Sequence, residues 1–221
     1  MNTRPLLILT IGLVAVEFAL SAIAWLQLPA GAEVPIHWDI SGEPDGYAPA
    51  ALALLLTPGI TLLLGLLLAV APRFDPRREN LVRSRPAYLW ITGSALVMTG
   101  VLHALVVLAA LGSEIDVVLV IALMTGALFV VIGNFLQKTR SSWFMGIRTP
   151  WTLSSERSWT ETHRLGGFAF MAVGVASALA AVVAGPEVFF WILLGGIGVS
   201  VVGLFAYSYL VWRDDPDRRT L

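Results

Sequence analysis

Six long apolar runs divide the sequence and restrict what it can fold into. Each run is about 20 residues long, which is the length that an α-helix needs to cross the hydrocarbon core of a bilayer. The runs are Leu6–Leu26, Ala50–Val70, Tyr88–Ala110, Val117–Leu136, Gly167–Ala184 and Val188–Leu210. Helices are expected because a segment in lipid must satisfy its own backbone polar groups. The sequence therefore predicts an all-α integral membrane protein, a six-transmembrane-helix bundle.

Composition supports a membrane setting. Charged residues make up 13% of the chain and hydrophobic residues 57%, whereas an ordinary soluble domain has roughly 25% charged residues. The first run contains Glu17 and lacks a clear small-residue cleavage site, so we interpret it as a retained anchor and not as a signal peptide. The chain has no cysteine, which excludes disulfides and thiolate metal sites.

The basic residues predict the orientation. All 14 lie before the first run, after the second, fourth and sixth runs, or close to these boundaries, and the other side of the membrane receives none. The positive-inside rule then predicts a multi-pass protein of the cell membrane with both termini cytoplasmic. The connection Arg73–Pro86 is rich in arginine and proline, and we expect it to be a solvated anchor of this topology.

Two long connections divide the chain into two predicted regions. Residues 1–110 form a three-helix membrane region with an acidic outer loop at 27–49, and residues 111–221 form a second three-helix region with an inner loop at 137–166. Both loops exceed the usual 2–8 residues of a helix connection. Long ordered loops often carry function.

The outer loop is a candidate contact site for a ligand or peptide. Its candidate residues are His37, Trp38, Asp39, Glu43, Asp45 and Tyr47. Pro44 presets a turn, and Gly42 and Gly46 can take positive φ. The His37 ring and the carboxylates could converge on a cationic ligand or a metal ion, although the spacing matches no standard metal signature and we assign none. The alternative is a structural turn whose carboxylates cap backbone amides.

The inner loop mixes aromatic and basic residues. Its candidate residues are Asn134, Lys138, Trp143, Arg148, Thr149, Pro150, Trp151, Trp159, His163 and Arg164. Such a mixture suits either an interfacial segment on the lipid bilayer or a docking surface for a cytoplasmic partner. We expect Thr152 or Ser154 to cap a short helix on which Glu156, Trp159, Thr160 and His163 share a face.

A histidine and a glutamate on one helix face also suit acid–base catalysis. The chain has no His-Glu-x-x-His, Gly-x-Ser-x-Gly or phosphate-loop motif. We therefore predict a protein that is not an enzyme, needs no cofactor and does not bind nucleic acid directly.

Two ionisable residues lie at membrane depth. Glu17 and His103 fall at similar depths in the first and third runs, so their side chains could pair. A pair would suit a proton- or solute-linked transporter, which is the alternative function; the other interpretation is a neutral, hydrogen-bonded Glu17. In the last run, the small residues favour close helix packing: Gly195, Gly196, Gly198, Ser200 and Gly203.

Several motifs resemble a known family. The inner stretches Gly133–Lys138, Trp143–Leu153 and Thr162–Arg164, with Trp159, resemble the SdpI-type family of membrane immunity proteins. The outer Pro35–Asp39 and Gly42–Tyr47 resemble the domain of unknown function that often precedes it, with Asp39 where that domain has asparagine. The resemblance spans roughly residues 10 to 212.

The resemblance implies a non-enzymatic role in bacterial self-protection. Members of the family are associated with resistance to a secreted antimicrobial peptide or toxin, and with signalling to a cytoplasmic regulator. The partners it implies are therefore a toxin peptide outside and a regulator inside, in addition to the bilayer.

Overall fold

The computed structural model describes residues 1–218, so Arg219, one of the 14 basic residues, lies outside the described part. Within that part, six helices are long and apolar enough to cross a membrane. They are α1 (Arg4–Trp25), α2 (Ala50–Val70), α4 (Arg85–Ala110), α5 (Val117–Leu136), α7 (Glu156–Ala184) and α8 (Pro186–Arg213). The prediction of six apolar helices is confirmed, and α2 and α5 have the predicted bounds.

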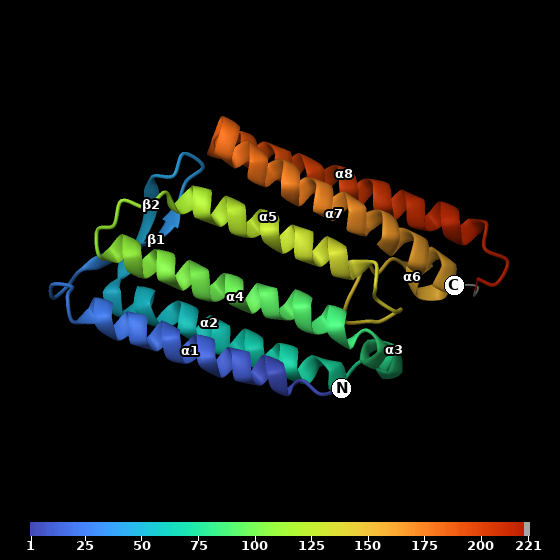
Figure 1. The fold of residues 1–221 in the computed structure, drawn as a ribbon, viewed down its shortest axis with the longest axis horizontal. Helices are drawn as coiled ribbons and strands as arrows, with labels where there is room; N and C mark the ends of the chain where they lie inside the picture. The colour runs from blue at the N-terminus through green and yellow to red at the C-terminus, as the bar shows by residue number, and fades with distance from the viewer. Residues whose placement is uncertain (219–221) are drawn as a thin grey trace.

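The helices pack as two groups of three that lie side by side (Figure 1). Helices α1, α2 and α4 contact one another, as do α5, α7 and α8, and the α4–α5 contact joins the two groups. At that contact the rings of Trp90 and Phe135 stack with centroids 5.7 Å apart. The start of α1 and the end of α8 lie at one end of the bundle, which we call the terminal end (Figure 1).

Glycines bring the backbones of α5 and α7 into direct contact. A Cβ added at Gly133 would lie 2.4 Å from the carbonyl oxygen of Gly167, and one at Gly174 would lie 2.6 Å from that of Gly126. Real Cβ atoms essentially never come this close, and the obstacle is backbone that cannot rotate away. Close packing of this kind is how transmembrane helices associate without a hydrophobic driving force.

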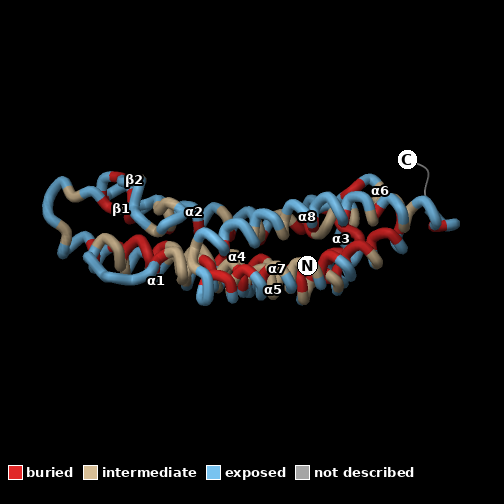
Figure 2. Tube along the Cα trace, turned by 90° about the horizontal axis from the view of Figure 1, so that it is seen from above, coloured by how far each residue is buried: buried red, intermediate tan, exposed pale blue. Residues whose placement is uncertain are grey.

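The expectation of close packing along α8 is wrong for most of its glycines. An added Cβ would meet nothing within 4 Å at Gly195, Gly198 or Gly203, and only Gly196 packs tightly, against Val173. Helix α8 is exposed along most of its length (Figure 2). Because its sequence is apolar, this surface suits contact with lipid.

The outer loop forms a β-hairpin, which departs from the all-α prediction. Strands β1 (Glu33–Trp38) and β2 (Pro44–Pro49) pair antiparallel at the end of the bundle opposite the terminal end, which we call the hairpin end (Figure 1). Gly42 has φ +95° in the turn as expected, but Gly46 does not have positive φ. Gly46 is instead needed for space, since an added Cβ would lie 2.9 Å from the Cβ of His37.

The connections at the terminal end are also more ordered than expected. The segment after α2 forms the 3₁₀ turn η1 (Ala71–Arg73) and the helix α3 (Arg78–Arg83), and the inner loop contains α6 (Pro150–Ser154). Thr149 caps α6 with a capping box, and Ser155 caps α7 by accepting a hydrogen bond from the backbone N–H of Ser158. The predicted caps Thr152 and Ser154 are therefore wrong, and the short helix toward Arg164 is the beginning of α7.

Candidate functional site

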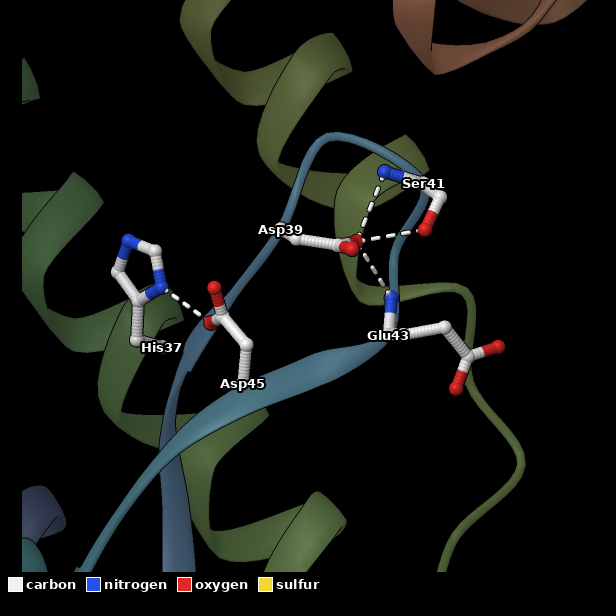
Figure 3. A network of polar contacts seen from close by, with 5 residues as sticks. All are labelled: His37, Asp39, Ser41, Glu43 and Asp45. Atoms are coloured by element: carbon white, nitrogen blue, oxygen red, sulfur yellow. Dashed lines mark hydrogen bonds and ion pairs between the residues drawn. The ribbon is translucent and has the colours of Figure 1, made fainter.

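The tip of the hairpin is organised by Asp39 (Figure 3). Its Oδ1 accepts hydrogen bonds from the backbone N–H of Ser41 at 2.8 Å, from the Ser41 hydroxyl at 2.7 Å and from the backbone N–H of Glu43 at 3.0 Å. The Ser41 hydroxyl, helped by these backbone donors, holds the pKa of Asp39 below its ordinary value. Asp39 therefore both shapes the turn and keeps its negative charge at neutral pH.

The remaining polar residues of the hairpin form a separate contact. The Nδ1 atom of His37 lies 2.5 Å from Oδ1 of Asp45 on the opposite strand, and both side chains are largely exposed (Figure 3). The Glu43 side chain points away from both contacts (Figure 3). The expected convergence of His37 and the carboxylates on one point does not occur. Within residues 1–218, no three His, Asp or Glu side chains are grouped so as to hold a metal ion.

The two aromatic candidates of the hairpin have different surroundings. Trp38 is half-buried against the cluster that contains Val34, Ala48 and Val106, and so anchors the hairpin on α4. Tyr47 is 55% exposed. Of the two, Tyr47 is therefore the more exposed residue.

The motif residues of the inner loop divide into a buried and an exposed set. The buried set is centred on His163, whose Nδ1 lies 2.7 Å from the carbonyl oxygen of Trp159 and whose Nε2 accepts from the backbone N–H of Ile147 at 2.8 Å. A carbonyl can only accept, so Nδ1 carries the hydrogen and Nε2 is the bare nitrogen. Both ring nitrogens are thus used to hold the loop on α7.

Trp159 and Gly146 complete this buried contact. The Trp159 ring stacks on the imidazole of His163 with centroids 3.9 Å apart, and its Nε1 donates to the carbonyl oxygen of Thr139 at 3.0 Å. Gly146 has φ +116°, and an added Cβ would lie 2.4 Å from Nε2 of His163. The four residues of the expected face all lie on α7, but Trp159 and His163 are buried whereas Glu156 and Thr160 are exposed. The acid–base pair of His163 with Glu156 is not assembled.

Thr149 and Trp151 attach the loop to α8. The hydroxyl of Thr149 donates to Oγ of Ser208 at 3.0 Å. The Trp151 ring packs against Phe205 and Tyr209, with centroids 4.7 and 5.2 Å away. These two motif residues therefore fix the position of α6 against the last helix.

The exposed set of motif residues faces outward from the terminal end. It consists of Lys138, Trp143, Arg148, Pro150 and Arg164. The Lys138 ammonium contacts Oδ1 of half-buried Asn134 at 3.2 Å, and a guanidinium N–H of Arg148 donates to the carbonyl oxygen of Trp143 at 2.6 Å. This exposed set is the part of the motif that is open to lipid or to another protein.

Asp75 is a key residue that sequence reasoning missed. Its buried carboxylate accepts from the hydroxyl of Ser142 at 2.6 Å, and from the backbone N–H groups of Arg77, Trp143 and Phe144 at 2.7, 3.2 and 3.3 Å. The segment 73–86 was expected to be solvated, and that expectation is wrong at Asp75. The only available signal was that Asp75 is one of two acids, with Glu79, in a basic connection.

Arg77 strengthens the same junction between the two halves. Its guanidinium donates to the hydroxyl of Ser141 and, at 2.5 Å, to the carbonyl oxygen of Leu153. Since Ser141 and Leu153 belong to the inner loop, the connection between α2 and α4 holds that loop in place. Arg77 thus has a structural role beyond its contribution to topology.

Glu17 ends a chain of hydroxyl groups inside the bundle. Thr99 Oγ lies 2.7 Å from the carbonyl oxygen of Leu96, Thr61 Oγ lies 2.8 Å from Thr99 Oγ, and Glu17 Oε1 lies 2.8 Å from Thr61 Oγ. Each hydroxyl has one hydrogen to donate. The Thr61 hydroxyl lies within donating distance of both Glu17 Oε1 and Thr99 Oγ, and its single hydrogen serves one of them at a time. When it goes to Thr99, the contact with Glu17 is a hydrogen bond only if the carboxyl of Glu17 is protonated and donates.

His103 belongs to a different chain. The hydroxyl of Ser21 donates to the carbonyl oxygen of Leu54 at 2.8 Å, and Nε2 of His103 lies 3.0 Å from both Ser21 Oγ and the backbone oxygen of Glu17. Nε2 therefore carries the hydrogen. The imidazole of His103 thus contacts the backbone of Glu17, whereas no hydrogen bond joins the side chains of Glu17 and His103.

The fold defines a class of protein: a multi-pass helical membrane protein with a hairpin at one end and an ordered, partly basic loop at the other. Residues 138–208 match the SdpI/YfhL protein family, and residues 12–62 match a domain of unknown function, DUF1648. No solved structure matches this chain.

One curated relative matches nearly the whole chain. It is the immunity protein SdpI of Bacillus subtilis (strain 168), which is 25% identical over 204 residues, covering 91% of this chain and 94% of the relative. The resemblance to SdpI-type membrane immunity proteins is confirmed, together with the preceding domain of unknown function.

Proposed function

We propose that this protein is a non-enzymatic membrane immunity protein that protects a bacterial cell against a secreted antimicrobial peptide or toxin. The terminal end would face the cytoplasm and the hairpin end the exterior. The similarity to an immunity protein supports the class of role. The observation that carries the mechanism is the charge of the hairpin end: segments 27–49, 111–116 and 185–187 contain seven carboxylates and no lysine or arginine.

The carboxylates are placed for contact with a cation. Asp45 and Glu43 are exposed, and Asp39 is kept ionised by its turn. Many membrane-active peptides are cationic, and opposite charge holds such a molecule against the surface and fixes its orientation. In this mechanism the hairpin sequesters the peptide before it damages the bilayer.

The terminal end would carry the signalling branch of the function. The exposed set Lys138, Trp143, Arg148, Pro150 and Arg164 would contact the inner leaflet or a cytoplasmic regulator. The buried set would only hold this surface in shape. Substitutions in the exposed set therefore test the signalling part of the proposal.

The triple variant Asp39→Asn/Glu43→Gln/Asp45→Asn tests the sequestration mechanism. Asparagine keeps the carbonyl acceptor that shapes the turn at position 39, so the change removes charge more than structure. We expect survival of a sensitive host under peptide challenge to fall at least tenfold at matched protein levels. The control is Asp214→Asn/Asp217→Asn, which removes exposed charges at the terminal end. Undiminished protection by the triple variant would contradict sequestration by these carboxylates.

Glu17→Gln separates immunity from the alternative of proton- or solute-linked transport. The glutamine amide has both a donor and an acceptor, so it keeps a hydrogen bond with Thr61 in either direction, and we expect the stability to change by less than about 1 kcal/mol and protection to be retained. A transporter that moves protons through Glu17 would lose its function completely. The measurement is host survival together with thermal unfolding of the purified variant; loss of protection with unchanged unfolding would favour transport.

A further inference from the structure

A groove opens between the two halves directly beneath the hairpin. Its volume is about 680 Å³, and its walls come from β1, the hairpin turn, α2, α4, α5 and α8. Apolar side chains dominate the lining, among them Trp38, Ile60, Leu102, Val118, Ile121 and Phe189. This size and this lining are typical of ligand sites, which are mostly apolar with a few placed polar groups.

The groove runs from the hairpin into the membrane-spanning part. On α4 its lining extends from Val106 to Thr99, which is about 10 Å at 1.5 Å per residue. The Thr99 hydroxyl donates to Leu96 and accepts from Thr61, so it retains one further acceptor position. The deep part of the groove therefore offers an acceptor within an apolar surface.

The mouth of the groove is acidic. Asp39 and His37 line it directly, and the seven carboxylates of the hairpin end are Glu33, Asp39, Glu43, Asp45, Glu114, Asp116 and Glu187. All three hydrogen bonds that the Asp39 side chain accepts end on Oδ1. Within residues 1–218, Oδ2 of Asp39 makes no hydrogen bond, so it remains available to a ligand.

We propose that this groove binds the apolar face of a cationic amphipathic peptide, whose lysine or arginine side chains contact the carboxylates at the hairpin end. The proposal rests on the proposed immunity function and gives the place where the peptide is held. Charge complementarity selects the occupant. A phospholipid brings a phosphate, and the segments at the hairpin end contain no lysine or arginine to hold one, whereas a cationic peptide pairs with the carboxylates.

Binding of a defined probe tests the proposal. The probe is a fluorescent 20-residue amphipathic peptide of lysine and leucine, titrated onto the full chain in nanodiscs of zwitterionic lipid. The filled-groove variant is Leu102→Trp/Ile121→Trp, and its matched control is Val199→Trp/Val202→Trp on the exposed surface of α8. We expect at least tenfold weaker binding to the filled-groove variant and parental binding to the control. Equal binding to all three proteins would overturn the groove as the site.

A second measurement covers the case in which the filled-groove variant does not fold. A photoreactive residue in place of Ile121 should crosslink to the peptide, whereas the same residue in place of Val199 should not. A peptide with glutamine in place of every lysine tests the charge requirement. If the glutamine peptide binds as well as the lysine peptide, or if a labelled phospholipid crosslinks at position 121 and the peptide cannot displace it, the cationic-peptide proposal is wrong.

The outcomes distinguish this inference from the proposed function. If the parent protects a host and the folded filled-groove variant protects equally, the groove proposal fails while immunity stands. If the parent protects against no peptide but binds the lysine peptide in the groove, immunity fails while the site stands.

Discussion

Gly133→Val is expected to unfold the contact between α5 and α7. Its Cβ would lie 2.4 Å from the carbonyl oxygen of Gly167, with the Met171 side chain and backbone also within 3.0 Å. Overpacking of a well-packed interior typically costs about 1–3 kcal/mol. We expect the upper part of that range or more here, because the obstacle is the backbone of a neighbouring helix. Thermal unfolding in detergent and the yield of monodisperse protein measure the effect.

Gly203→Val on α8 is the matched control for this prediction. It places the same β-branched side chain in a membrane-spanning helix, but an added Cβ at Gly203 meets nothing within 4 Å. The intrinsic cost of valine in the helix is therefore shared, and only the contact differs. An equal loss of stability in both variants would show that the α5–α7 approach is not what Gly133 provides.

Gly146→Ala is expected to detach the inner loop from α7. The new Cβ would lie 2.4 Å from Nε2 of His163 and 2.7 Å from the Trp159 ring, and φ +116° disfavours any residue with a Cβ. The loop must shift, which breaks the hydrogen bond from the backbone N–H of Ile147 to His163. We expect a loss of about 3 kcal/mol. Faster proteolysis within 137–155 would report the detachment.

Gly112→Ala separates the two contributions to that prediction. Gly112 also has positive φ, +76°, but an added Cβ meets nothing within 4 Å. Its alanine variant therefore carries the backbone strain without the collision. If Gly146→Ala and Gly112→Ala lose the same stability and the inner loop stays protected from proteases, the collision with His163 does not contribute to the loss.

The membrane-spanning helices could be predicted well because each one is determined by its own apolar sequence and by the lipid around it. An apolar run of sufficient length must form a helix in lipid, and the bounds of α2 and α5 follow from the sequence alone. The beginning of α7 could not be predicted in this way. Residues 156–166 are mostly polar, and they continue the helix because Trp159 and His163 are buried by the inner loop instead of by lipid.

The candidate sites could be predicted as segments but not as contacts. The hairpin was missed because β1 and β2 are short and contain three prolines, Pro35, Pro44 and Pro49, and their pairing depends on packing against α2 and α4. Asp75 was missed because its partners Ser142 and Phe144 are nearly 70 residues away in the chain. The direction of a side chain such as His163 likewise depends on a distant backbone N–H.

The acidic hairpin end also has a limited range. Exposed charges are screened over about 8 Å at physiological ionic strength, so the seven carboxylates act only on molecules that already lie close to them. Under these conditions the carboxylates do not attract a peptide from bulk solution, and the peptide would first have to bind to the bilayer surface. In dilute buffer the screening length grows to about 30 Å, and the same end would then draw cations directly from solution. As the salt concentration falls, the hairpin end should therefore begin to capture peptides directly from solution, and no longer only peptides that are already on the bilayer surface.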